Sequence, residues 1–184
     1  MAKDDESTAT CCYGLGFAYY HTMDYHKSLT YYQKGLVLNE GIGDKFGTAV
    51  GYNNIADICL KIADVDKALE FALKALDLLE EAGQHEDGFA SEFQITVGDI
   101  YLAQGLHDKA EERYLLALQI SRNVDYIEGQ IFSNTKLGEF KLRLKLPEEA
   151  CEYLERGMNL SHEAGNITEE RKCRDLLAQA YAAD

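Results

Sequence analysis

The chain has 184 residues, of which 46% are hydrophobic and 27% are charged, and it contains a single proline. This composition can fill a hydrophobic core and excludes wholesale disorder. The formal net charge of −14 disfavours binding to nucleic acid or to an anionic membrane surface. No run of apolar residues approaches the roughly 18 that a membrane-spanning helix needs.

The first seven residues are polar and acidic, which is the wrong composition for a signal peptide, and we expect residues 1–7 to form a polar tail. The five cysteines are odd in number and follow no spacing typical of a disulfide framework. They favour a reducing compartment, so we expect a cytoplasmic protein.

From residue 8 onward the sequence repeats with a period of about 40 residues. A small residue recurs at Gly16, Ala56, Gly98, Gly138 and Ala178, so the steps are 40, 42, 40 and 40 residues. Self-similarity at such a period indicates stacked supersecondary units. It predicts one solenoid domain over residues 8–184, with repeats at about 8–44, 45–87, 88–127 and 128–166 and a terminal helix over 168–184.

Each repeat is predicted to be a pair of antiparallel helices. Apolar residues at helical spacing predict two helices over residues 48–82, and Asp64 is suited to cap the start of the later one. Gly83 is suited to end it. In other repeats the later helix opens at Asp24, or carries Pro147 in its first turn, where a missing N–H group costs nothing.

The recurring small residues are predicted to let the two helices of a pair approach closely. Glycine in a helix interior costs up to about 1 kcal/mol relative to alanine, so its recurrence indicates a benefit. A leucine in place of Gly98 would separate a pair at a cost of about 1–3 kcal/mol. The later helices carry matching small residues: Ser28, Ala68, Ala110 and Ala150, and two turns on Gly35, Ala75, Ala117 and Gly157.

The order of small and aromatic residues resembles the tetratricopeptide repeat. Gly-Phe-Ala-Tyr at 16–19 followed by residues 28–35, and Gly-Asp-Ile-Tyr at 98–101 followed by residues 110–117, carry the resemblance. It implies an all-α, right-handed α-solenoid of antiparallel helix pairs, with four repeats and a C-terminal capping helix. The repeats are longer than the usual 34 residues. In this they are similar to those of LGN/Pins adaptors, rapsyn, kinesin light chains and some bacterial peptide-sensing regulators.

The resemblance also implies that the first helix of each pair lines a concave groove for a peptide of a partner protein. An amide such as Asn54 suits a peptide backbone because it both donates and accepts hydrogen bonds. Asp57, Asp99 and Glu139 occupy equivalent positions, and such an acidic row would favour a basic or mixed-charge ligand. For both features the alternative is an ordinary solvated helix face. The groove residues that we expect to bind are Tyr13, Phe17, Tyr20, Asn53, Asn54, Asp57, Asp99, Phe132, Thr135, Lys136, Glu139 and Arg143.

The sequence offers no motif for catalysis, a cofactor or a metal. Residues 41–47 have the wrong spacing for a dinucleotide fingerprint, and they follow a helix instead of a strand. Adjacent cysteines on a helix, such as Cys11 and Cys12, point about 100° apart and do not readily share one ion. Family members that clamp the C-termini of chaperones need several basic residues and asparagines, of which only Asn54 has a counterpart here, so we expect no such binding.

The sequence therefore predicts a non-catalytic scaffold or adaptor that binds a protein or peptide. Two alternatives stay open. One is a structural role, as a self-associating homo-oligomer or a fragment of a longer solenoid. The other is a regulator that senses a peptide or small molecule in the same groove.

Overall fold

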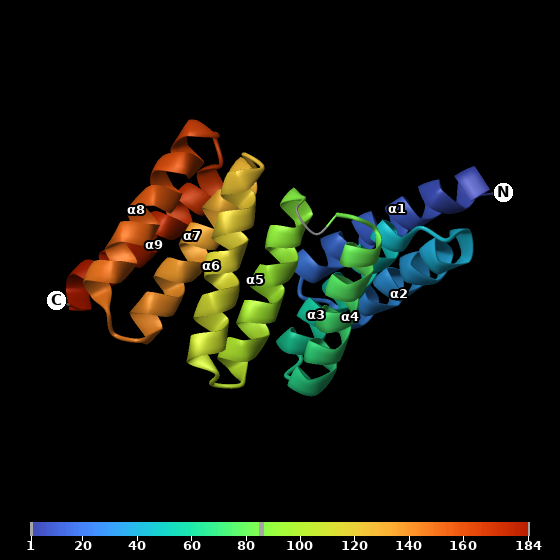
Figure 1. Ribbon diagram of the computed structural model, residues 1–184, viewed down its shortest axis with the longest axis horizontal. Helices are drawn as coiled ribbons and strands as arrows, with labels where there is room; N and C mark the ends of the chain where they lie inside the picture. Colours follow the sequence, from blue (N-terminus) through green and yellow to red (C-terminus); the bar gives the residue numbers. More distant parts are fainter. Residues whose placement is uncertain (1, 85–86, 184) are drawn as a thin grey trace. The chain divides into compact units, whose positions relative to one another are not determined.

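In a computed structural model, residues 2–84 and 87–183 are described, and they fold entirely into helices and short turns (Figure 1). Consecutive helices pack as antiparallel pairs, followed by one unpaired helix at the C-terminal end of the series. The predicted all-α solenoid of helix pairs with a capping helix is therefore confirmed. The chain divides into two compact units, which meet at residues 85 and 86.

Unit 1 contains two helix pairs. Its helices are α1 (Ala2–His21), α2 (Tyr25–Ile42), α3 (Lys45–Lys61) and α4 (Val65–Glu81). The predicted caps at Asp24 and Asp64 are present, and each carboxylate accepts a hydrogen bond from the backbone N–H three residues later. Asp44 caps α3 in the same way. Residues 4–7, which we expected in a polar tail, lie in the first turns of α1.

Unit 2 contains two further pairs and the terminal helix. Its helices are α5 (Gly88–Ala103), α6 (His107–Asn123), α7 (Ile127–Arg143), α8 (Pro147–Glu163) and α9 (Ile167–Ala183). Pro147 is the first residue of α8, as the sequence predicts. Two buried clusters form the core of this unit, one around Tyr114 and Phe140 and the other around Leu154 and Leu177.

Left-handed backbone conformations mark both kinds of turn. Four of these residues close the turn within a pair, namely Met23, Ala63, Gly105 and Lys145. The other four close the turn between pairs, namely Gly43, Gly83, Asp125 and Gly165. Taken in chain order, all eight are spaced by 20 residues, except for the 22 that separate Gly83 from Gly105. The underlying period of the backbone is thus a single helix and its turn.

The small residues of the first helices pack against the second helices, as predicted. A Cβ atom on Gly98 would lie 2.6 Å from the ring of Tyr114, and one on Gly16 would lie 2.7 Å from the ring of Tyr32. Gly138 meets Leu154 at the equivalent place. In each pair the larger residue follows the glycine by 16 positions.

The second pair solves the same packing problem with two alanines. The first-helix position is Ala56, and the residue 16 positions later is Ala72; both are buried. Glycine thus faces tyrosine or leucine, whereas alanine faces alanine. The summed size at the crossing is therefore conserved along the chain even though the individual residues are not.

Candidate functional site

The first helices of unit 2 present a partly exposed face with a repeated pattern. On α5 the half-buried residues between buried neighbours are Glu92, Thr96 and Asp99. On α7 the same places are taken by Phe132, Lys136 and Glu139. These positions are spaced by four and three residues, so they share one side of each helix.

Charged residues on this face form a connected row across three helices. The Nζ atom of Lys136 lies 2.7 Å from a carboxylate oxygen of Asp99 and 3.9 Å from one of Glu139. Lys172 of α9 continues the row, with its Nζ atom 2.9 Å from Glu139. We call Asp99, Lys136, Glu139 and Lys172 the charge row. Its signs alternate from α5 through α7 to α9, and its formal charge is zero.

The charge row corrects the expectation of a free acidic row in this part of the chain. Asp99 and Glu139 are both paired with lysines, and the hydroxyl of Tyr114 also donates to Asp99 over 2.7 Å. The pKa of Tyr114 is raised by burial and by the neighbouring carboxylate, which keeps this hydroxyl protonated as a donor. The equivalent positions of the repeats align the acids, but the intervening lysines neutralise them.

Two of the expected binding residues have structural roles instead. Thr135 is only 1% exposed, and its hydroxyl is bonded to the carbonyl of Ile131 and lies 3.2 Å from the sulfur of Cys173. It packs between α7 and α9 and does not face solvent, so the expectation for Thr135 was wrong. Tyr13 donates its hydroxyl to the carbonyl of Gly47 over 2.7 Å and accepts from Asn39, which ties α1 to α2 and α3.

The remaining expected residues of unit 2 lie at or near the surface. Phe132 is partly buried and packs against the Tyr114 cluster. Arg143 is exposed at the end of α7. Both follow the charge row along the same helix.

In unit 1 the expected residues lie on the corresponding sides of α1 and α3. Phe17 is 60% exposed, and its ring contacts that of His21. Asn53, Asn54 and Asp57 are half-buried.

The carboxylate of Asp57 in unit 1 has two neighbours. It lies 3.9 Å from Lys61, and it raises the pKa of Tyr20 together with the burial of that ring. Asn53 has a buried side-chain oxygen without a hydrogen-bond partner. The polar face of α3 thus differs from that of α7 in having amides where α7 has an aromatic ring and a buried amide.

Two contacts of the unit 2 face were missed by sequence reasoning. Lys172 was assigned to the polar surface of the cap, although it occupies the position equivalent to Phe132, which could have placed it on the face. Tyr126 donates a 2.6 Å hydrogen bond to Glu92, whose pKa is raised by burial. Nothing in the spacing of the sequence signals that second contact, because Tyr126 lies in a turn.

Comparison with known proteins agrees with this architecture. Two family profiles, both described as tetratricopeptide repeat, match residues 7–81 and 91–124, together more than half of the chain. No curated protein matches the sequence. The chain belongs to the tetratricopeptide repeat family, whose domains are typically protein–protein interaction modules.

Solved structures with the same fold are distant in sequence. The apo form of RapI superposes with a TM-score of 0.75 at 16% identity, over 96% of this chain and 68% of RapI. Aspartyl phosphate phosphatase F from Bacillus subtilis gives 0.78 at 15% identity, over 95% of this chain and 45% of the phosphatase. Kinesin light chain-like repeats of Podosopora anserina give 0.69 at 15% identity, over 95% and 85%. The chain thus spans less than half of the phosphatase, and these likenesses show the fold alone.

Across the residues that the structure describes, none of the helices has the length and apolar character required to cross a membrane.

Proposed function

We propose that this chain is a non-catalytic adaptor that binds a peptide segment of a partner protein on the exposed faces of its first helices. Membership of the tetratricopeptide repeat family supports the general role. The observation that carries the proposal is the charge row. Its side chains are 20%, 27%, 28% and 40% exposed for Asp99, Lys136, Glu139 and Lys172, so all four are held in place and still reachable from solvent.

The alternating signs of the charge row favour a peptide that carries both basic and acidic residues. A basic side chain would compete with Lys136 for Asp99, while an acidic one would be attracted to Lys172. Ion pairs at a partly exposed surface are each worth about 1 kcal/mol or less, so a ligand can exchange partners at small cost. Complementary charge then sets which peptide binds and in which register.

The cytoplasm is the compartment that we propose for this adaptor. All five cysteines are free in the structure, which suits a reducing environment.

The test begins with random 12-residue peptides displayed on phage and selected against the immobilised full chain. Synthetic versions of the enriched peptides are then titrated calorimetrically. We expect enriched peptides to contain residues of both signs. We also expect them to bind the double variant Glu139→Lys/Lys172→Glu at least about tenfold more weakly, because the swap inverts the charges presented to the ligand.

A matched control is available on the second-helix side of the same unit. Glu152 and Arg156 of α8 form an exposed ion pair with an N–O distance of 3.7 Å. The swap Glu152→Arg/Arg156→Glu preserves the net charge of the chain as the first swap does, and it should leave peptide affinity unchanged. Peptides that tolerate the first swap, or a selection without enrichment, would remove the first-helix face from the proposal.

A further inference from the structure

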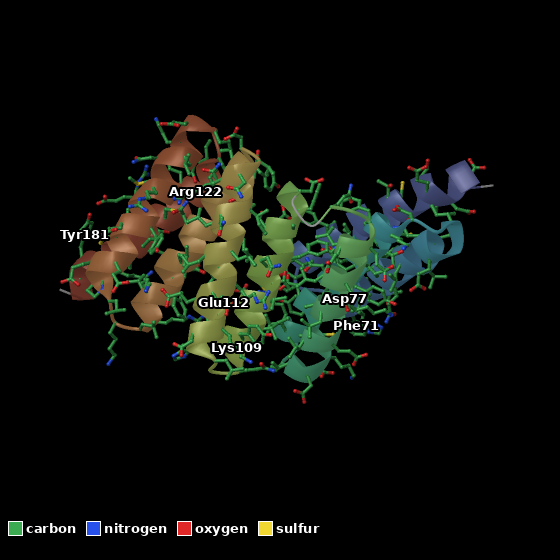
Figure 2. All side chains as sticks on the ribbon, viewed as in Figure 1. Phe71, Asp77, Lys109, Glu112, Arg122 and Tyr181 are labelled. Atoms are coloured by element: carbon green, nitrogen blue, oxygen red, sulfur yellow. The ribbon has the colours of Figure 1, made fainter. Side chains whose placement is uncertain are left out.

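A pocket of about 460 Å³ lies between α8 and α9. We call it the terminal pocket. Tyr181 stands at its edge, 60% exposed, with its hydroxyl 3.1 Å from a carboxylate oxygen of Glu155 (Figure 2). Its lining combines apolar and polar groups from both helices: Glu155, Met158, Asn159, Arg174, Leu177, Ala178 and Tyr181.

The terminal pocket occupies a place that is covered one repeat earlier. Forty residues before Ala178 is Gly138, which is buried against Leu154 of α8. Forty residues before Tyr181 is Lys141, which is 8% exposed and paired with Glu111 and with Glu149 of α8. Each position that α8 covers on α7 therefore has an equivalent on α9.

On α9 these equivalents are open. Ala178 is exposed, whereas Gly138 is buried. Arg174 is exposed, whereas its equivalent Asn134 is 1% exposed. The terminal pocket is thus a continuation of the repeated interface between first and second helices, with the surface for a second helix formed and uncovered.

The internal pairs indicate which helix would fit. A first-helix glycine faces tyrosine or leucine, as Gly98 faces Tyr114, but the first-helix alanine Ala56 is followed 16 positions later by Ala72. The terminal pocket offers Ala178, so it has room for a small residue at the crossing. Helix α4 carries the appropriate pattern, because Ala68, Ala72 and Ala75 are all buried in its own pair.

We propose that the terminal pocket binds an amphipathic helix of a partner protein, with small residues at positions i, i+4 and i+7 of its buried face. The partner helix would lie across α8 and α9 as α8 lies across α6 and α7. This surface is separate from the charge row, so the inference does not depend on the proposed peptide site. A second copy of this chain is disfavoured as the occupant because its matching helix α4 is already buried in unit 1.

The probe is a synthetic peptide with the sequence of residues 64–82, labelled with fluorescein. Isolated helices of this length are marginal in water, so a lactam joins Glu70 to Lys74, which both lie on the exposed side of α4. Fluorescence anisotropy with the full chain should give saturable binding. Ala178→Trp, which fills the pocket, should weaken binding at least about tenfold. The control Ala103→Trp changes another exposed alanine of unit 2 and should have no effect.

A reciprocal pair of changes tests the size rule directly. The same peptide with Ala72→Tyr should bind the original chain at least about tenfold more weakly. It should regain affinity with Ala178→Gly, because that pair reproduces the arrangement of Gly98 and Tyr114. Circular dichroism verifies that each chain variant is folded.

Three outcomes would overturn the proposal. The first is absence of peptide binding up to about 100 μM, which corresponds to a binding free energy weaker than about −5.5 kcal/mol. The second is binding that Ala178→Trp does not affect. The third is concentration-dependent association of the chain, seen in sedimentation and abolished by Ala178→Trp, which would assign the terminal pocket to a second copy.

Discussion

Replacing Gly98 by alanine tests whether the helix pairs depend on close approach. In a helix interior this change alone would stabilise the fold by about 1 kcal/mol. The added methyl group would, however, lie 2.6 Å from the ring of Tyr114, which is 1% exposed and fixed by its hydrogen bond to Asp99. Overpacking of a buried site costs about 1–3 kcal/mol, so we expect a net loss of about 0–2 kcal/mol. Leucine at this position should cost more.

The matched control is Gly14→Ala in α1. Nothing lies within 4 Å of the position that its Cβ atom would take, and the residue is exposed. This variant should gain up to about 1 kcal/mol from helix propensity alone. Urea unfolding followed by circular dichroism at 222 nm then measures a difference of about 1–3 kcal/mol between two chemically identical substitutions.

A double-mutant cycle with Tyr114→Ala identifies the cause. The combination of alanine at 98 and at 114 recreates the pairing of Ala56 with Ala72, so the double variant should be more stable than the sum of the single effects by about 1–3 kcal/mol. The reasoning would be refuted if Gly98→Ala stabilised the chain as much as Gly14→Ala, or if the two changes were additive.

Three further substitutions test individual contacts by urea unfolding. Tyr13→Phe should lower the free energy of unfolding by about 1–3 kcal/mol, because it leaves the amide of Asn39 and a backbone carbonyl without a partner; an unchanged midpoint would argue against a structural role. Lys141→Ala should cost about 2 kcal/mol because two carboxylates lose a nearly buried partner, and the loss should largely survive in 0.5 M salt, unlike that of a surface pair. Glu92→Gln should raise stability at neutral pH because burial raises the pKa of Glu92 and so penalises its charged form. This penalty is present above the raised pKa and disappears as the pH falls through it. The advantage of glutamine should therefore shrink on acidification, and an advantage that grew instead would contradict the assignment; the amide oxygen can still accept from Tyr126.

The fold could be predicted from the sequence because its signals are local and recur. The small residues around Gly98 and its equivalents fix the helix pairing, and Asp24, Asp64 and Pro147 mark where second helices begin. The start of α1 was less predictable. Its first residues are polar and carry no apolar periodicity, yet Thr8 and Thr10 bond back to carbonyls four residues earlier within the helix.

The site was harder to predict because it depends on side chains that meet across helices. Equivalent positions correctly align Asp99 with Glu139, but the pairing of Lys136 with both depends on the separation of α5 and α7. Thr135 shows the same difficulty from the other side. It is polar and adjacent to the exposed Lys136, and only the packing of α9 reveals that it is buried next to Cys173.

The constant spacing of the left-handed turn residues has a consequence for how such a chain can grow or shrink. Asp125 and Gly165 are both left-handed and both close a turn between pairs, so the segment 126–165 begins and ends at equivalent backbone geometry. A tandem duplication of that segment would add α7 and α8 as a finished module, and the new copy of α8 would meet α9 as the original does. Only the 22-residue step between Gly83 and Gly105 departs from this interchangeable scheme. Ligand surfaces on such a chain can therefore be multiplied by copying DNA in units of 120 nucleotides, about three per residue, without redesigning a single helix contact.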